Sequence, residues 1–387
     1  MIPHPIFLVP SGYNFRAVLA FCRALRQAGQ APAVIACTGE DPIFRTNFAS
    51  NVVFTRSSLQ LDVADFAAAA SAVRAQPGAA RCVLAPASEF LVRWALRHRA
   101  ALAAAGCDLP LPDEATYLRV SDKESFTAFC RERGLPVPVE LSSPPQLPCV
   151  AKPRWNVAPD GSSLYPWLLR TPDDLTRFTA EARTGDFFFQ EWVEGRSFYL
   201  LLHLPKDGVT TRYSQENLAQ QPGGKSILLA RAARMHVTAE VARWEAALRA
   251  AGFHGLVMLE LRQRGAEFVL IEANPRLWGP LQLCVDGCPA LLQHYIAEHT
   301  GHALPAASAV PERRSANYLW SGGLPSSGRP VWHGTAPLLP RLTLLRHAAS
   351  DVYLRADSWR QFLHEHRLPP TESADLPAKE VNLVPSY

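Results

Sequence analysis

Apolar runs of strand length alternate with amphipathic stretches over the first third of the chain. The apolar runs cover residues 6–10, 33–37, 52–54 and 82–86. The longer stretches between them have helical spacing, over residues 15–28, 65–75 and 90–105. This alternation predicts an α/β fold with a parallel sheet that is covered by helices on both faces.

The loop after the first strand reads Ser11-Gly12-Tyr13-Asn14 and lacks the G-x-G-x-x-G pattern of dinucleotide-binding proteins. The segment therefore resembles a Rossmann-like layer without that fingerprint. We expect it to bind a substrate or to support the next domain. The sequence Pro110-Leu111-Pro112 then marks a predicted domain boundary.

Beyond this boundary, strands and helices are predicted in a less regular order. Ser121 is expected to cap a helix that ends at Gly134, because Glu124 follows three residues later, as in a capping box. Further strands are predicted over residues 149–153, 187–193 and 197–204, helices over 172–183 and 237–251, and a β-hairpin over 255–261 and 267–272. The tail beyond residue 311 predicts only a weak helix over 358–366. Its aromatic side chains either fill a core, pack over the site or form a dimer surface.

Composition and charge exclude several classes of protein. The chain has 387 residues, 48% hydrophobic and 19% charged, with a formal net charge of +4 and no dense basic run, so nucleic acid is not an expected partner. No apolar run reaches the roughly 18 residues of a membrane span, and the N-terminus lacks a signal-peptide pattern. The eight cysteines are scattered without zinc spacing. We therefore expect a cytoplasmic protein with reduced, partly buried thiols.

Two carboxylates on the predicted hairpin provide the main candidate chemistry. Glu260 and Glu272 are expected to lie opposite or diagonal to each other, with Asn274 on the same side as Glu272 because alternate residues of a strand share a face. Two carboxylates beside such apolar runs need a cation, and oxygen ligands of this kind suit Mg²⁺. A salt bridge to Arg262 or Arg276 is the structural alternative.

Five short motifs follow one another between residues 123 and 276. They are Ser-Asp-Lys at Lys123, Val-Ala-Lys-Pro at Lys152, Gln-Glu-Trp-Val-Glu-Gly over residues 190–195, Glu260, and Glu-x-Asn-Pro-Arg from Glu272 to Arg276. In this order they resemble the ATP-grasp superfamily, of the carboxylate–amine ligase type. The resemblance implies a Rossmann-like pre-ATP-grasp domain over residues 1–112, a two-lobed ATP-grasp domain over 113–310 with lobes over 122–195 and 196–310, and a C-terminal extension over 311–387.

The resemblance also implies roles for individual residues. Lys123 and Lys152 would contact the nucleotide phosphates as point charges. The loop over residues 155–165 would cover them, with Ser162 and Ser163 replacing the glycines usual in the family; an ordinary surface loop is the alternative. The implied adenosine contacts are Gln190, Glu191, Trp192, Val193 and Glu194, with main-chain contacts from Glu191 and Val193 and a ribose contact from Glu194.

The implied metal ligands are Glu260, Glu272 and Asn274, and the implied catalytic residues are Arg276, Lys152 and Arg231. Arg231 and Arg234 would clamp a substrate carboxylate or the γ-phosphate. A solvated helix charge is the alternative for either of them.

The function implied by the resemblance is an ATP- and Mg²⁺-dependent ligase, with Mn²⁺ as an alternative metal. It would phosphorylate a substrate carboxylate and couple the acyl phosphate to an amine, releasing ADP and phosphate. The expected partners are small carboxylates and amines, amino acids among them, and a second copy in a homodimer, with no nucleic acid and no membrane. The alternatives are a catalytically reduced ATP-binding regulatory module, or an ATP-grasp enzyme that uses a thiol or bicarbonate.

Overall fold

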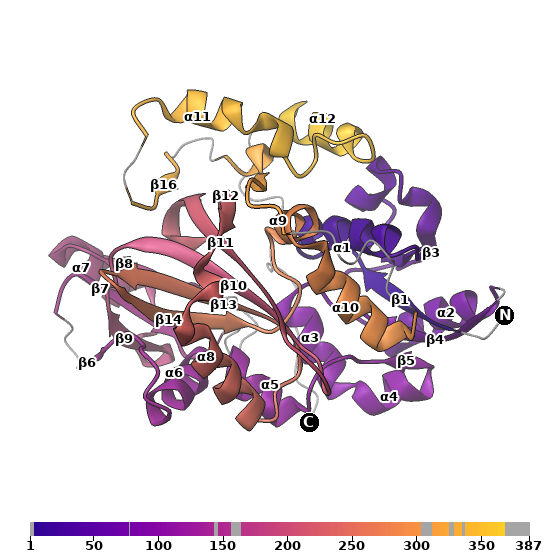
Figure 1. Cartoon of the computed structure of the whole chain (residues 1–387), viewed down its shortest axis with the longest axis horizontal. Helices are drawn as coiled ribbons and strands as arrows, with labels where there is room; N and C mark the ends of the chain where they lie inside the picture. Colours follow the sequence, from indigo (N-terminus) through magenta and orange to yellow (C-terminus); the bar gives the residue numbers. More distant parts are fainter. Residues whose placement is uncertain are drawn as a thin grey trace.

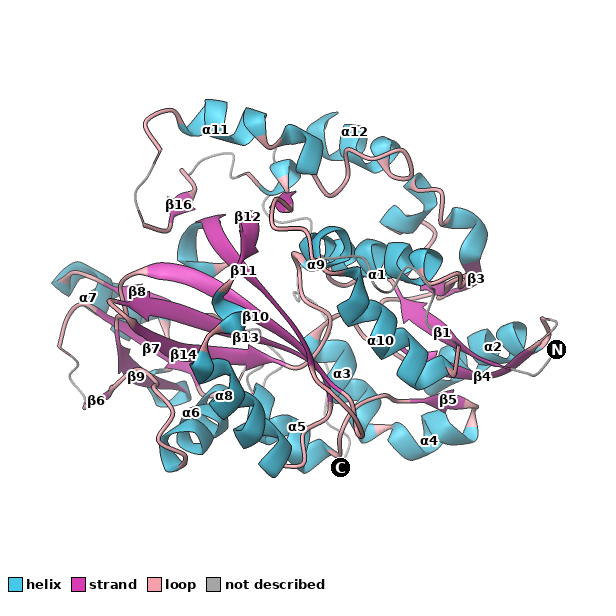
Figure 2. Ribbon diagram, viewed as in Figure 1, coloured by secondary structure: helices cyan, strands magenta, loops and turns pink. Residues whose placement is uncertain are grey.

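A computed structural model gives the structure of the chain. It describes residues 4–76, 78–142, 146–155, 164–302, 312–324, 329–334 and 337–367. Over these residues the chain forms a parallel sheet, a large antiparallel sheet and a small antiparallel sheet, with helices packed around them (Figures 1 and 2).

The parallel sheet is built by the N-terminal residues and has the strand order β3-β2-β1-β4-β5. Its strands are β1 (His4–Pro10), β2 (Ala33–Ala36), β3 (Val52–Thr55), β4 (Ala79–Leu84) and β5 (Cys107–Asp108). Its helices are α1 (Phe15–Gln27), α2 (Val63–Arg74), α3 (Glu89–Arg97) and α4 (Arg99–Ala104). Alternate side chains of β1 enter two different cores: Phe7 and Val9 pack with α1, and Leu8 packs with α2. The predicted α/β layer is confirmed.

Two details of the predicted helices are wrong. The single helix expected over residues 90–105 is broken at His98, which has φ −103° and ψ 16° between α3 and α4. The capping box expected at Ser121 does not form, because Ser121 is the last residue of a helix that the pattern missed, α5 (Glu114–Ser121). Asp113 caps α5 by accepting from the Thr116 amide, and α6 (Lys123–Glu132) begins after Asp122 without a side-chain cap.

The large sheet has the order β14-β13-β10-β11-β12-β15, and β16 pairs with β11. Its strands are β10 (Arg196–Leu204), β11 (Thr211–Gln220), β12 (Ile227–Ala233), β13 (Gly255–Arg264), β14 (Glu267–Asn274), β15 (Asn317–Leu319) and β16 (Val331–Trp332). On one face, Leu200 and Leu202 pack against α8 (Ala239–Ala250). On the other face, Tyr199 and Leu201 join the core that contains α1. The predicted hairpin is confirmed as β13 and β14.

The small sheet has the order β6-β9-β7-β8. Its strands are β6 (Glu140–Leu141), β7 (Cys149–Pro153), β8 (Trp167–Leu169) and β9 (Phe187–Glu191), and α7 (Pro172–Glu181) packs beside it. The predicted strand over residues 149–153 is confirmed. Thr171 and Asp174 form a capping box at the start of α7.

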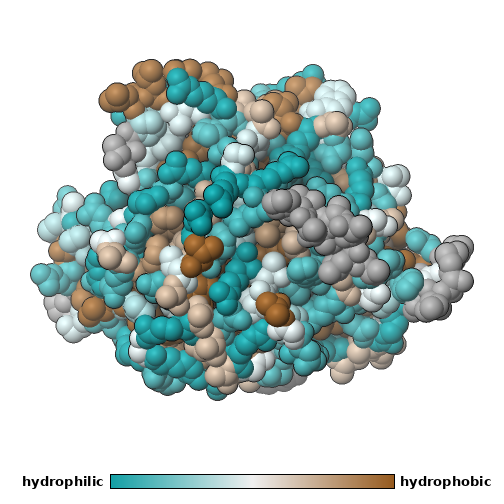
Figure 3. Space-filling model, viewed as in Figure 1, coloured by the Kyte–Doolittle hydropathy of each residue, from teal (hydrophilic) through white to brown (hydrophobic). Residues whose placement is uncertain are grey.

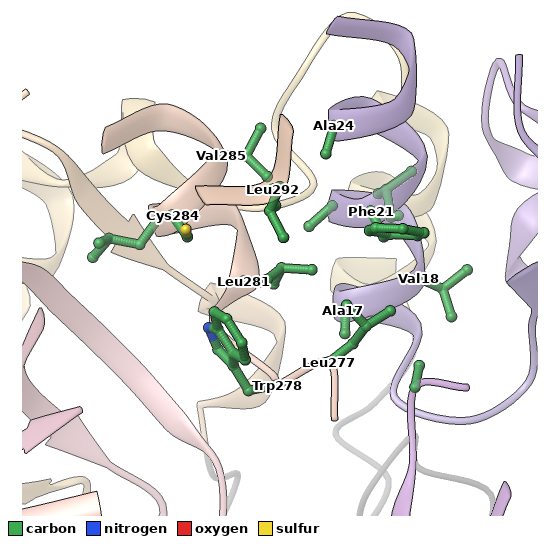
Figure 4. Packing of buried hydrophobic residues seen from close by; sticks show 14 of the residues in the cluster. Ala17, Val18, Phe21, Ala24, Leu277, Trp278, Leu281, Cys284, Val285 and Leu292 are labelled. Carbon is green, nitrogen blue, oxygen red and sulfur yellow. The ribbon is translucent and has the colours of Figure 1, made fainter. Parts of the chain in front are cut away.

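Two helices after β14 return to the N-terminal layer. They are α9 (Leu281–Gly287) and α10 (Pro289–Thr300). Figure 4 shows Ala17 and Phe21 of α1 lying toward Leu281 and Leu292. One core therefore runs from residue 7 to residue 353 and crosses the boundaries proposed at residues 112 and 310, which remain a prediction.

The C-terminal segment, described over residues 312–324, 329–334 and 337–367, arches over the molecule (Figure 1). It contains α11 (Pro340–Arg346) and α12 (Trp359–Arg367), the latter where a helix was predicted. Trp320 is buried, as core filling requires, whereas Trp359 is 48% exposed. Exposed leucines gather at α11, where Figure 3 shows an apolar patch at the upper left; they are Leu338, Leu339, Leu342 and Leu345.

Short 3₁₀ helices complete the structure. They are η1 (Pro42–Arg45), η2 (Ala49–Asn51), η3 (Thr184–Asp186), η4 (Pro222–Gly224), η5 (Met235–Val237), η7 (Ser321–Gly323) and η8 (Ala348–Ser350). All eight cysteines lie in the described part of the chain, where each is buried and free. Among the described helices, none combines the length and apolar character needed to cross a bilayer.

Candidate active site

Glu260 and Glu272 face each other across β13 and β14. The two residues are direct partners in the antiparallel register, and Tyr199 of β10 pairs with Glu260 on its other side. The Tyr199 hydroxyl hydrogen-bonds with the Glu260 carboxylate. Both carboxylates therefore lie on the sheet face that carries Tyr199, as the predicted hairpin implied.

The ladder shifts by one residue directly after this pair. Leu261 pairs with Leu270, so Ile271 has no partner in the β13–β14 register. A bulged residue of this kind leaves its main-chain groups outside the ladder. The Ile271 carbonyl accepts a 2.8 Å hydrogen bond from Nζ of Lys152.

Lys152 and Lys123 bring positive charge to the two carboxylates. Lys152 comes from β7 of the small sheet and is 6% exposed, so burial lowers the pKa of its ammonium to about 8, although the nearby Glu272 acts in the opposite direction. Lys123 begins α6 and also acts on Glu272. The structure thus brings both predicted lysines near Glu260 and Glu272, two of the three predicted metal ligands.

The environments of the two carboxylates differ. Burial, followed by the charge of Glu272, raises the pKa of Glu260 to about 7. The pKa of Glu272 is lowered: burial acts to raise it, but Lys123, Lys152 and a hydrogen bond from Asn274 together outweigh burial. Glu272 is therefore ionised at neutral pH, while the positive charge near Glu260 is too weak to offset its burial.

Asn274 and Arg276 continue the site beyond β14. Asn274 donates from Nδ2 to Glu272 at 2.9 Å and accepts at Oδ1 from Nη2 of Arg276 at 2.8 Å. Nε of Arg276 lies 3.8 Å from Glu89, at the start of α3. The Arg276 guanidinium therefore spans the gap between the large sheet and the N-terminal layer.

A cavity of about 340 Å³ opens beside these groups. The N-terminal layer and the large sheet both contribute to its wall, which includes Gly12, Tyr13, Asn14, Arg16, Ser88, Glu89, Tyr199, Lys225, Ser226, Met258, Glu260, Glu272, Asn274, Arg276 and Trp278. Arg16 is 5% exposed, donates to the hydroxyls of Ser226 and Tyr318, and lies over the Trp320 ring with Cζ 3.7 Å from the centroid. The cavity thus has the carboxylates at one wall and a fixed guanidinium at another.

The predicted adenosine-binding segment lies at the edge of the small sheet. The side chain of Gln190 is buried and donates to Thr127, so it points toward α6. The Glu191 amide donates to the Val139 carbonyl, so this amide is already engaged within the protein. The side chain of Glu191 pairs with Arg264.

The remaining residues of this segment differ in exposure. Val193 is buried, Trp192 is partly buried and Glu194 is exposed. Gly195 follows with φ +136°, and a Cβ there would lie 2.0 Å from the Gln263 carbonyl, so this turn requires glycine. The segment therefore approaches β13 closely, which brings it beside the strand that carries Glu260.

The structure keeps some predicted residues away from this cluster. Arg231 lies on β12, where Nε and Nη2 both bond to Glu216, and it does not line the cavity. The helical interpretation of Arg231 is wrong, because β12 pairs with β11 and β15. Arg234 follows the end of β12. Ser162 and Ser163 lie outside the described residues.

Several residues near the carboxylates were given no binding role by the sequence. Arg262, considered only as a salt-bridge partner, lies outside the cavity lining, but it follows Glu260 by two positions and shares its strand face. Arg16, Glu89 and Lys225 come from distant parts of the chain, and no local pattern in the sequence links them to the carboxylates. Tertiary packing alone brings them to the cavity.

The carboxylate pair fits a Mg²⁺ ion that is held largely by phosphate and water. Among the described residues, no group of three or more His, Cys, Asp or Glu side chains is arranged to hold a metal. Glu260 and Glu272 nevertheless present two facing carboxylates whose mutual repulsion a divalent cation would relieve. Mg²⁺ commonly binds through one or two carboxylates together with substrate phosphates. Asn274 in this arrangement holds Glu272 and Arg276, and its metal contact remains a prediction.

Comparisons with solved structures identify the fold. No protein-family model matches the chain, and no curated protein matches it. Biotin carboxylase from Campylobacter jejuni is similar at a TM-score of 0.58 and 14% identity, covering 80% of this chain and 74% of that chain. N5-carboxyaminoimidazole ribonucleotide synthetase from Thermus thermophilus is similar at a TM-score of 0.58 and 19% identity, covering 83% and 84%.

A third structure is the biotin carboxylase domain of 2-oxoglutarate carboxylase from Hydrogenobacter thermophilus, solved with MgADP, ADP and bicarbonate. It is similar at a TM-score of 0.57 and 13% identity, covering 82% of this chain and 74% of that chain. These likenesses define the class of fold, in which a parallel α/β layer is joined to antiparallel sheets. The chain has the ATP-grasp fold, as the resemblance of its motifs implied.

Proposed function

We propose that the chain is an ATP- and Mg²⁺-dependent ligase that activates a carboxylate as an acyl phosphate and joins it to an amine. The observation that carries this proposal is the convergence of Glu260, Glu272 and Arg276 at one cavity, with the buried ammonium of Lys152 held beside Glu272. Two carboxylates for a metal, a buried ammonium and a guanidinium are the groups that phosphoryl transfer needs.

In this proposal, ATP lies between the small and the large sheet. The segment over residues 190–195 holds the adenosine, with Glu194 at the ribose, and the ammonium groups of Lys123 and Lys152 hold the phosphates. Glu260 and Glu272 would hold Mg²⁺, which supplies a template and neutralises phosphate charge when bound.

The residues act mainly by orientation and charge. The substrate carboxylate attacks the γ-phosphorus, ADP leaves, and Lys152 and Arg276 stabilise the charge that develops on the transferred group. The amine then attacks the acyl carbon and phosphate leaves. Burial of Lys152 strengthens this contact because the site excludes water around its ammonium.

The cavity is the proposed site of the carboxylate and the amine. Its volume of about 340 Å³ is in the range of small-molecule sites and suits organic substrates of amino-acid size. Arg16 and Lys225 can bind a carboxylate, while Glu89 can bind an ammonium group. This mixed lining supports amino acids as candidate substrates. A homodimer remains a prediction.

A second candidate is an enzyme that phosphorylates bicarbonate. It is favoured by the likeness to a carboxylase domain solved with bicarbonate. The mixed charge of the cavity lining favours an organic carboxylate instead. A non-catalytic ATP-binding module is the third candidate, and the complete set of charged groups argues against it.

The test is ADP release by the purified chain with MgATP. Pairs of amino acids, other carboxylates with amines, and bicarbonate with amines are supplied in parallel, with Glu272→Gln as the inactive control. Release that requires both a carboxylate and an amine supports the ligase. Release with bicarbonate in place of every organic acid supports the second candidate. MgATP binding without stimulation by any acceptor would leave only the binding module.

A further inference from the structure

The polar face of the large sheet extends past the carboxylate pair. Arg262 follows Glu260 on β13 and pairs with Ser197 of β10, so it shares the face that carries Tyr199 and Glu260. Its charge acts on both Glu260 and Lys152. Arg262 is therefore part of the same electrostatic environment as the proposed metal site.

The Arg262 guanidinium also reaches the proposed adenosine-binding segment. Its Cζ lies 5.9 Å from the centroid of the Trp192 ring, and Nη1 lies 3.5 Å from the Gly195 carbonyl. A nucleotide with its base at residues 190–195 and its phosphates at Glu260 and Glu272 must pass this point. Arg262 thus lies between the two ends of the proposed ATP site.

His333 holds this guanidinium from the C-terminal segment. Nη1 of Arg262 lies 2.8 Å from Nδ1 of His333, and Nε2 of His333 lies 2.9 Å from Oε1 of Gln220. Arginine has no acceptor, so Nδ1 must accept and Nε2 must carry the proton that is donated to Gln220. Burial, followed by the charge of Arg262, lowers the pKa of His333 to about 3, which keeps the imidazole neutral.

The contacts of His333 fix its position. Its main-chain amide donates to the Leu218 carbonyl, and the preceding strand β16 pairs with β11. Gln220 in turn donates to the carbonyl of Lys225, which lines the cavity. Within the described residues, both hydrogen bonds of the Arg262 guanidinium use Nη1, so Nε and Nη2 are available to a ligand.

We propose that Arg262 contacts ATP between its base and its phosphates, and that His333 of the C-terminal segment is the positioning residue for this contact. The inference rests on the proposed function. The ligand atoms are the oxygens of the ribose and of the first phosphate, to which a guanidinium donates strongly. The C-terminal segment thereby completes the nucleotide site, because it supplies the acceptor that orients Arg262.

The test measures MgATP affinity by calorimetry and compares KM for ATP with kcat. Arg262→Met should weaken MgATP binding at least about tenfold, since it removes a charge-assisted contact. His333→Ala should weaken it about threefold or more, while His333→Asn, whose Oδ1 can replace Nδ1 as acceptor, should restore it. Each change should raise KM for ATP and leave kcat within about threefold. Arg341→Met, an exposed change on α11, is the control.

A double-variant cycle tests the positioning role. Arg262→Met combined with His333→Ala should bind no more weakly than Arg262→Met alone, because His333 acts through Arg262. Arg262→Lys keeps the positive charge but lacks the paired N–H donors of the guanidinium. It is used if the methionine variant does not fold.

Each remaining result decides against one part of the inference. MgATP affinity of both Arg262 variants within twofold of wild type would overturn the contact. Additive losses would overturn the positioning role. A wild-type chain that does not bind MgATP would instead remove the proposed function itself.

Discussion

Lys152 donates from its ammonium group to the Ile271 carbonyl, the group that the bulge between β13 and β14 leaves outside the ladder. This contact joins the small sheet to the large sheet beside Glu272. It also fixes a buried cation where the proposed phosphates lie. The bulge therefore has a consequence for the site, because it provides the acceptor that orients Lys152.

We predict that Lys152→Met lowers kcat/KM for ATP by about 100-fold or more, since it removes a buried charge directed at the phosphates. Lys206→Met, at an exposed lysine, is the matched control and should leave the rate unchanged. Steady-state assays of ADP release measure both. Comparable rates for the two variants would remove Lys152 from the site.

The lowered pKa of Lys152 predicts that the protein takes up protons when nucleotide binds. This pKa is lowered to about 8, chiefly by burial, so part of the ammonium is neutral above that pH. Phosphate oxygens favour the charged form and raise this pKa, so binding of MgATP above pH 8 should take up protons. Calorimetry in two buffers of different ionisation enthalpy measures the uptake, which Lys152→Met should abolish.

Glu260→Gln should keep or raise the stability of the metal-free protein and remove its stabilisation by Mg²⁺. Burial and Glu272 raise the Glu260 pKa from 4.5 to about 7, so the folded state binds more protons than the unfolded state between these values. Stability is therefore lost as pH rises through this window, by up to about 3 kcal/mol above pH 7. We expect Glu260→Gln to be at least as stable as wild type at pH 8 without metal.

The same variant should lose the stabilisation that Mg²⁺ gives to wild type in the presence of ADP. Thermal melts in chelator and in Mg²⁺ with ADP measure both effects. Glu181→Gln, at an exposed position on α7, should behave as wild type. A Glu260→Gln protein that is less stable without metal, or that keeps its response to Mg²⁺, would contradict the paired-carboxylate site.

The sequence was sufficient for the carboxylate pair but not for the strands around it. Glu260 and Glu272 could be paired because a regular hairpin alternates its side chains. The strand β11 was missed because its Ser214, Gln215, Glu216 and Asn217 look like loop residues yet are buried. Several of their polar groups bond to partners on other elements, among them Ser197 and His236, which no local pattern in the sequence indicates.

Arg231 shows the same limitation. Its neighbours Ala230 and Ala232 are compatible with a helix, and only the pairing with β11 and β15 makes this segment a strand. The partner of its guanidinium is Glu216, fifteen positions earlier in the chain. Local patterns thus predicted residues whose partners lie on one hairpin, and missed those whose partners come from distant strands.

Asp357→Ala is expected to cost about 3–5 kcal/mol, because it leaves a buried arginine without its counter-charge. Arg23 of α1 and Asp357 of the C-terminal segment pair at 2.6 Å, with side chains only 8% and 16% exposed. The matched control is Asp108→Ala, which breaks an exposed pair with Arg81 and should cost at most about 1 kcal/mol. Urea unfolding measures both. Equal, small losses would show that the C-terminal segment contributes little to the stability of the N-terminal layer.

His299 should make the fold sensitive to acid. Burial lowers its pKa from 6.5 to about 4, although Glu298 opposes the shift. The unfolded chain therefore binds a proton that the folded chain excludes, and stability falls as pH drops from 6.5 to 4, by about 3 kcal/mol. The neighbouring Glu298, with a pKa lowered to about 2, titrates below this window.

His299→Gln should flatten the stability curve between pH 6.5 and 4, whereas the exposed His366→Gln should not. Urea unfolding at several pH values measures the slope, and an unchanged slope in His299→Gln would assign the acid sensitivity to other groups.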